Sequence, residues 1–95
     1  MAAYFIAQIE VTDPVEFDEY RQLVAPLVAK YGGKYVVRGG AIENAEGDWM
    51  PKRLVILEFD SMERLKAWHE SDEYRPVMAK RHNSAITKAV MVEGA

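Results

Sequence analysis

One connection in the middle of the chain, residues 39–52, concentrates groups that could bind a small molecule. It follows Arg38, begins with two glycines, and also holds three carboxylates and Trp49. The guanidinium group of an arginine recognises a carboxylate through two parallel hydrogen bonds, and glycines let the backbone approach a ligand closely. We therefore predict a site in which Arg38 orients an acidic group and Trp49 forms a lid. The ligand-binding residues expected here are Arg38, Gly39, Gly40, Glu46 and Trp49.

The same residues also allow a purely structural interpretation. Gly39 and Gly40 could simply turn the chain. Arg38 could pair with Glu46 or Asp48. No G-x-x-x-x-G-K-[ST] or G-x-G-x-x-G pattern surrounds the glycines, so the sequence does not indicate a phosphate-binding loop. Both interpretations stay open from the sequence alone.

A second group of candidate residues lies around Trp68 and His69. A histidine can act as a base near neutral pH, so His69 is a candidate catalytic residue. Tyr74, through its hydroxyl, and Glu58, as a buried carboxylate, are two further candidates. Trp68 is expected mainly in the core, and both Trp68 and Tyr74 are expected to contact a ligand. The competing interpretation for His69 is an exposed ring, or one hydrogen-bonded to Glu73 or to the backbone.

Several kinds of chemistry find no support in the sequence. The chain has no cysteine and only two histidines, His69 and His82, without the H-x-x-x-H spacing of a preformed metal site, so we expect no metal and no cofactor. Its net charge of −3 and the lack of a sustained basic stripe argue against a nucleic-acid partner. No apolar run approaches the roughly 20 residues of a membrane helix. We expect a cytoplasmic protein without a membrane partner.

Helices and strands follow one another regularly within a single expected domain, residues 1–95. A helix is predicted from Asp13-Pro14 to Gly32-Gly33, because Asp13 is a good N-cap and Pro14 suits the first helical position. A second helix is predicted from Ser61, with a restart at Ser71-Asp72-Glu73. Alternation of apolar residues and short apolar runs indicate the strands. The strands are expected at residues 4–11, 34–38, 53–59 and 86–93.

This order of elements predicts an α+β protein of the ferredoxin-like class. The expected βαββαβ unit has a four-stranded antiparallel sheet with two helices on one face. The other face would still carry apolar side chains, namely Tyr4, Ile6, Leu54, Ile56, Val90 and Val92. Because water should not cover these side chains, we expect a homodimer that packs sheet to sheet about a two-fold axis, a dimeric α/β barrel.

Short motifs along nearly the whole chain resemble a known family. They include Asp13-Pro14 with Tyr20, Lys30-Tyr31-Gly32-Gly33, Glu46-Gly47-Asp48-Trp49 and Ser71-Asp72-Glu73-Tyr74. As a whole-chain pattern the sequence is similar to the proteins of the domain of unknown function 1330 family, within the dimeric α/β-barrel superfamily. The resemblance implies a homodimer of ferredoxin-like subunits and no established activity. Superfamily relatives include cofactor-free monooxygenases and muconolactone-type isomerases, but none of their catalytic residues is carried over to this chain.

Three functions are compatible with this sequence. The leading hypothesis is a module that binds a small acidic or aromatic molecule in an apolar pocket between sheet and helices, with residues 39–52 at its entrance. The first alternative is a cofactor-free oxygenase or isomerase, in which His69, Tyr74 or Glu58 acts on an activated C–H bond; superfamily analogy alone supports it. The second alternative is a structural dimer without a ligand.

Overall fold

The first strand defines the two faces of the sheet. A computed structural model describes all 95 residues, Met1–Ala95. In β1 (Ala3–Val11) every second side chain from Ala3 to Ile9 is buried, whereas Tyr4, Ile6 and Gln8 between them are only partly buried. Successive side chains of a strand point to opposite faces. The sheet therefore has an inner face toward the helices and an outer face away from them.

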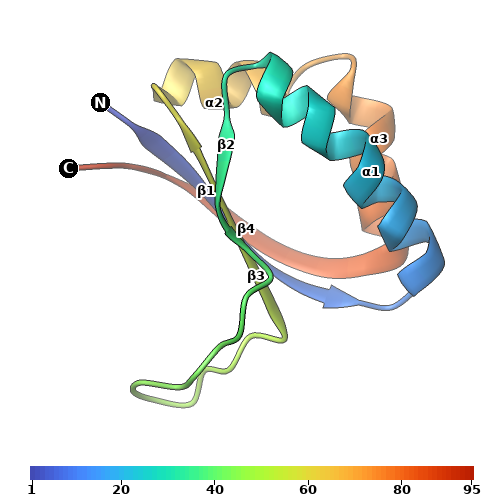
Figure 1. The fold of residues 1–95 in the computed structure, drawn as a ribbon, viewed down its shortest axis with the longest axis vertical. Coiled ribbons are helices and arrows are strands. Elements are labelled where there is room, and N and C mark those ends of the chain that lie inside the picture. The colour runs from blue at the N-terminus through green and yellow to red at the C-terminus, as the bar shows by residue number, and fades with distance from the viewer.

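The sheet has the strand order β2-β3-β1-β4, and every neighbouring pair of strands is antiparallel. All the helices lie on the inner face (Figure 1). After β1 the elements are α1 (Pro14–Lys30), β2 (Lys34–Arg38), β3 (Arg53–Phe59), α2 (Met62–His69), α3 (Tyr74–Ser84) and β4 (Ala85–Glu93). The structure confirms the predicted ferredoxin-like βαββαβ topology. No helix has both the length and the apolar composition needed to cross a membrane.

The predicted second helix consists of two separate helices, so three helices rather than two cover the sheet. Ser71 is the physical cause. Its hydroxyl group donates a hydrogen bond to the carbonyl oxygen of Trp68 at 2.9 Å and accepts one from the backbone N–H of Tyr74 at 3.1 Å. One side chain thus satisfies backbone groups at the end of α2 and at the start of α3, which lets the chain change direction between them.

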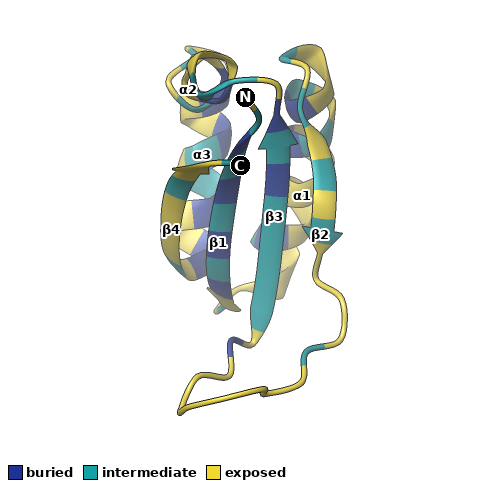
Figure 2. Cartoon of the chain, turned by 90° about the vertical axis from the view of Figure 1, so that its left-hand side faces the viewer, coloured by how far each residue is buried: buried dark blue, intermediate teal, exposed yellow.

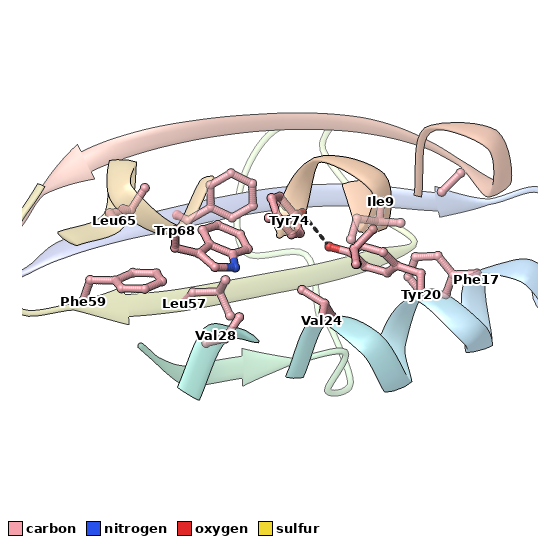
Figure 3. Close-up of a cluster of buried hydrophobic side chains, with 14 of the residues drawn as sticks. Ile9, Phe17, Tyr20, Val24, Val28, Leu57, Phe59, Leu65, Trp68 and Tyr74 are labelled. Carbon is pink, nitrogen blue, oxygen red and sulfur yellow. Dashed lines mark hydrogen bonds between the residues drawn. The ribbon is translucent and has the colours of Figure 1, made fainter. Parts of the chain in front are cut away.

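Aromatic side chains form the centre of the core, between the inner face and the helices (Figure 3). Trp68 and Tyr74 are fully buried, and their ring centroids lie 4.4 Å apart. The Trp68 ring also stacks on Phe59 at 5.6 Å, and its edge meets Phe5 at 5.4 Å. The prediction that Trp68 belongs to the core is confirmed. This packing joins α2 and α3 to the two central strands.

A register shift in β2 decides which face Arg38 occupies. Tyr35 pairs with Leu57, but Val37 pairs with Ile56 and Arg38 with Val55, so the register slips by one residue at Val36. An extra residue of this kind reverses the alternation of side chains beyond it. Arg38 therefore lies on the inner face beside Tyr35, whereas an unbroken register would place it on the outer face opposite Leu54.

No helix covers the outer face of the sheet, which is turned toward the viewer in Figure 2. Its central strands contribute Tyr4, Ile6, Leu54 and Ile56, which are partly buried by their neighbours. On the edge strand β4, Val90 and Val92 are 59% and 44% exposed. The predicted uncovered apolar face is therefore present in the single chain.

Gly33 provides a test of the packing between α1 and the sheet. A Cβ atom at Gly33 would lie 2.6 Å from the Phe59 ring and 2.9 Å from Val28. We expect Gly33→Ala to lower the free energy of unfolding by about 1–3 kcal/mol, as overpacked core substitutions do. A Cβ atom at Gly40 would meet nothing within 4 Å. Gly40→Ala is therefore the matched control, and equal urea-unfolding midpoints for the two variants would contradict this account.

Candidate functional site

A cavity lies between the inner face of the sheet and the helices. Fourteen residues line it, of which ten are hydrophobic, and the other four are Arg21, Arg38, Arg53 and Arg81. No aspartate or glutamate is part of the lining. An apolar pocket with a few convergent polar groups is the usual form of a small-molecule site. Here every convergent charge is positive, so the cavity is suited to an anion.

The walls of the cavity leave little open space in the present conformation. The centres of water molecules have about 30 Å³ available to them, which is enough for one or two waters. Two of the lining arginines reach the surface: Arg38 is exposed, and the Arg21 side chain is 48% exposed. These two side chains can move without disturbing the core. A ligand larger than water would enter by displacing them.

Arg53 is the first residue of β3 and faces inward, opposite Ile9. Its guanidinium carbon lies 5.6 Å from the centre of the Phe17 ring. Burial lowers the pKa of Arg53, and repulsion from Arg21 and Arg38 lowers it further. Its buried Nε atom has no hydrogen-bond partner. The site therefore concentrates positive charge, and the only ion pair that one of its four arginines makes is the exposed one between Arg21 and Asp18, at 3.9 Å.

Gly39 makes room for the Arg53 guanidinium group. Its φ angle is +70°, a conformation that other residues rarely adopt, and a Cβ atom at this position would collide with Arg53. The sequence predicts that Gly39 contacts a ligand. The structure instead packs it against an arginine that lines the cavity, so its contact with the site is indirect.

Arg81 contributes a buried charge at the other end of the cavity. It lies on α3 and is only 4% exposed. Its Nη1 atom donates a hydrogen bond to the Tyr74 hydroxyl at 3.1 Å and its Nη2 atom donates to Nε2 of His82 at 3.5 Å. The buried Nε atom has no partner, and Arg81 forms no ion pair. An unpaired buried charge is costly, typically by several kcal/mol. A bound anion would offset this cost.

Two tyrosines connect Arg81 to the cavity. The hydroxyl oxygens of Tyr74 and Tyr20 lie 2.9 Å apart, as the dashed line in Figure 3 marks. Tyr20 lines the cavity, whereas Tyr74 lies directly behind it. Trp68 also lines the cavity, and its buried Nε1–H has no acceptor. Three lining residues, Arg53, Trp68 and Arg81, thus carry a buried N–H donor without a partner.

His69 lies next to this site but does not line it. Its ring packs against Phe5, Trp68 and Tyr74, with centroid distances of 5.6–5.9 Å. Burial lowers the pKa of His69, and the positive charge of Arg81 adds to this effect. The expected alternative of a bond to Glu73 is not formed, because the Glu73 carboxylate accepts hydrogen bonds from Lys30 and Tyr31 instead.

Glu58 is not a buried carboxylate at this site. It pairs with Tyr4 and Lys34 across the sheet and therefore lies on the outer face. Its side chain is 27% exposed, with Oε1 3.6 Å from Lys34 Nζ. In the single chain Glu58 is only partly buried, because the alternation within β3 turns Leu57 and Phe59 inward, and Glu58 between them must point outward.

The connection 39–52 extends beyond the end of the sheet, away from the helices (Figures 1 and 2). Asn44 holds it together by donating to the carbonyl oxygens of Gly47 and Trp49, at 3.0 and 2.9 Å. Trp49 is 59% exposed, and its Nε1 donates to Oε1 of Gln8 at 2.6 Å.

Gln8 belongs to the outer face, so Trp49 does not form a lid over the cavity between sheet and helices. Neither Glu46 nor Gly40 lines that cavity. Arg38 forms no ion pair with Glu46 or Asp48, and its guanidinium carbon lies 4.2 Å from the centre of the Tyr35 ring. Of the predicted ligand-binding residues, the structure brings Arg38 and Trp68 to the cavity and places Tyr74 behind it.

Arg21, Arg53 and Arg81 are not among the site residues predicted from the sequence. A signal for two of them was present. Arg53 shares the alternating inward positions of Val55 and Leu57, and Arg81 falls seven residues after Tyr74, on the same helical face. A charged residue at a position that faces the core indicates a binding site more strongly than the polar residues of the exposed connection 39–52 do.

Comparison with solved structures defines the class of protein. A protein of unknown function from Rhodopseudomonas palustris superimposes with a TM-score of 0.74 at 14% identity, covering 99% of this chain and 82% of that one. The cofactor-independent oxygenase SnoaB from Streptomyces nogalater gives 0.67 at 11% identity, covering 99% and 93%. A protein of the ethyl tert-butyl ether d (EthD) family from Bacillus halodurans gives 0.60 at 22% identity, covering both chains fully. These similarities show that the chain has the ferredoxin-like fold of these structures.

The family follows from the sequence. The chain belongs to the family called domain of unknown function (DUF1330), whose model matches residues 2–95. No curated protein matches the sequence. The expected family is therefore confirmed.

The lowered pKa of His69 predicts a dependence of stability on pH. In the unfolded chain a histidine titrates near pH 6.5, whereas folded His69 binds its proton only at lower pH. The unfolded state therefore takes up protons first, and this contribution to stability is complete above about pH 6.5 and is lost as the pH falls toward the pKa of the folded state.

We expect His69→Gln to lose less stability than the wild type between pH 7.5 and pH 5.5 (about one unit on either side of the free-histidine pKa), measured by urea unfolding. His82→Gln controls for the removal of one imidazole group. An identical pH dependence in wild type and His69→Gln would contradict the prediction.

Proposed function

We propose that this protein binds a small organic anion, a carboxylate with a compact apolar or aromatic body, in the cavity between sheet and helices. One observation carries the proposal. The four charged residues of the cavity lining are all arginines, and three buried N–H groups on lining residues have no partner. A carboxylate supplies both the negative charge and the acceptor oxygens that these groups lack.

The remaining lining supports an apolar body on the same ligand. Phe17, Tyr20, Tyr35 and Trp68 present aromatic surface around the arginines. Aromatic rings favour contact with flat apolar groups, and they also hold guanidinium groups in place, as the Tyr35 ring does for Arg38. The ligand would therefore direct its carboxylate toward the arginines and its apolar part toward these rings.

We also propose that the protein is a homodimer that packs through the outer face of the sheet. The apolar side chains on this face are left uncovered in the single chain, and no helix reaches them. The dimer would bury them twice in an isologous contact. The cavity lies on the other side of the sheet, so ligand binding and dimerisation can be tested separately.

The oxygenase or isomerase alternative has less support. It requires a base in contact with the ligand, and neither His69 nor Glu58 lines the cavity. SnoaB is described as a cofactor-independent oxygenase, but its likeness to this chain, at 11% identity, concerns the fold. Binding of an anion is therefore the function that the geometry supports best.

Binding can be tested with benzoate as the probe and isothermal titration calorimetry as the measurement. We expect wild-type protein to bind benzoate, and Arg38→Ala or Arg53→Gln to weaken binding by about tenfold or more, because a hydrogen bond to a charged group contributes about 1.5–3 kcal/mol. Arg75→Ala is the matched control, since Arg75 is exposed and pairs with Asp72. No heat of binding in the wild type, or equal affinity in the Arg38 and Arg53 variants, would refute the proposed site.

The dimer can be tested by light scattering of the purified protein. We expect a mass of twice 10.8 kDa in the wild type. Val90→Lys should shift the mass toward the monomer, because Val90 lies opposite Ile6 on the outer face and a lysine there would be desolvated. Val15→Lys is the matched control: Val15 is 73% exposed at the start of α1, outside the proposed interface. A monomeric wild type would refute the dimer.

A further inference from the structure

The surroundings of Arg81, Tyr74 and Tyr20 favour one direction for the hydrogen bonds between them. A guanidinium group only donates, so the Tyr74 hydroxyl oxygen accepts from Arg81 Nη1. Tyr74 is fully buried, and the Tyr20 hydroxyl is the one remaining oxygen within hydrogen-bond distance of its own O–H. A buried donor without an acceptor is costly, and only Tyr20 lines the cavity, where a water or ligand oxygen can accept from it, so Tyr74 donates to Tyr20. The charge of Arg81 thereby orients both phenols.

This direction leaves the hydrogen atom of the Tyr20 hydroxyl without a protein acceptor. The Tyr20 hydroxyl makes no hydrogen bond other than the one with the Tyr74 hydroxyl. It is 7% exposed and lines the cavity. Hydrogen bonds that run in series polarise one another, and here the series begins at a positive charge. The Tyr20 O–H is therefore a strengthened donor at the cavity wall.

The rest of the surroundings keeps this donor protonated and places it beside positive charge. Burial raises the pKa of Tyr74 well above its ordinary value, so the Tyr74 hydroxyl, in the middle of the series Arg81–Tyr74–Tyr20, keeps its proton near neutral pH. The Arg81 guanidinium carbon lies 5.8 Å from the Tyr20 ring centroid. The other arginines of the cavity come from α1, β2 and β3. The cavity thus offers two different features: arginines for a carboxylate, and one oriented phenol donor for a second oxygen.

We propose that the Arg81–Tyr74–Tyr20 relay makes the Tyr20 hydroxyl the hydrogen-bond donor to a second, anionic oxygen of the ligand, so that the site takes hydroxy-aromatic acids in their phenolate form. This inference rests on the proposed function, since the arginines hold the carboxylate of the same molecule. A preorganised donor aimed at an oxyanion stabilises the charged form over the neutral one. The site would therefore lower the pKa of the bound phenol.

The experiment uses 4-hydroxy-3-nitrobenzoate, whose phenolate form absorbs at longer wavelength than its phenol form. Its absorbance is titrated against pH, free and in the presence of saturating protein. We expect the phenol pKa of the bound probe to lie below that of the free probe in the wild type. Tyr20→Phe should raise the pKa of the bound probe by about one unit relative to wild type, a tenfold change in the ionisation constant. Tyr74→Phe should give part of this change.

Tyr35→Phe is the matched control. Tyr35 also lines the cavity, but its hydroxyl takes no part in the relay, so we expect the wild-type pKa of the bound probe. The arginines are in place in all three variants and stay charged throughout. His69 on α2 is neutral at and above neutral pH because its pKa is lowered. The difference in the phenol pKa of the bound probe between Tyr20→Phe and Tyr35→Phe therefore measures the effect of the relay and not that of the positive charge of the arginines.

Benzoate affinity separates failure of this inference from failure of the proposed function. Benzoate has no phenol oxygen, so its binding to the wild-type protein tests the anion site without the second oxygen of the ligand. If benzoate binds and the bound probe has the same phenol pKa in wild type and Tyr20→Phe, the relay is refuted and the anion site stands. If neither acid binds, both proposals are refuted. Should Tyr20→Phe fail to fold, the comparison of Tyr74→Phe with Tyr35→Phe decides in the same way.

Discussion

The buried, unpaired charge of Arg81 is the constraint to which the rest of the site conforms. A guanidinium group in the interior needs acceptors, and in this chain no carboxylate provides one. Tyr74 accepts from it, and Tyr20 accepts from Tyr74. The positive charge of Arg81 thereby polarises the two hydroxyl groups toward the cavity, and no carboxylate neutralises it. A fold that keeps such a charge in its core has a structural reason to bind an anion.

The other arginines reach the cavity through local irregularities of the backbone. The register shift at Val36 turns Arg38 to the inner face, and the positive φ angle of Gly39 leaves space for Arg53. Both features lie where β2 ends. Irregularities of this kind next to a site re-aim side chains that regular alternation would direct elsewhere. The two glycines after Arg38 thus differ in role: Gly39 supports a cavity residue, and Gly40 contacts nothing that a Cβ atom would disturb.

The two faces of the sheet have separate roles in this account. The inner face carries the core and the cavity, whereas the outer face carries Glu58, Gln8 and, through Gln8, the indole of Trp49. The connection 39–52 follows the outer side, so its carboxylates stay away from the arginines. This separation preserves the positive character of the cavity, because an aspartate or glutamate close to Arg38 or Arg53 would neutralise it.

Alternation, helical spacing and caps are local patterns, so the elements, the topology and the two faces could be predicted from the sequence. Trp68 as a core residue was predictable on these grounds, whereas the inward position of Arg38 was not. Only the tertiary structure shows which arginine side chains lie together around the cavity. Arg21, Arg53 and Arg81 come from three elements far apart in the chain, and the shift at Val36 depends on pairing with β3. Such convergence has no local signature, since it arises when separate elements pack on one sheet face.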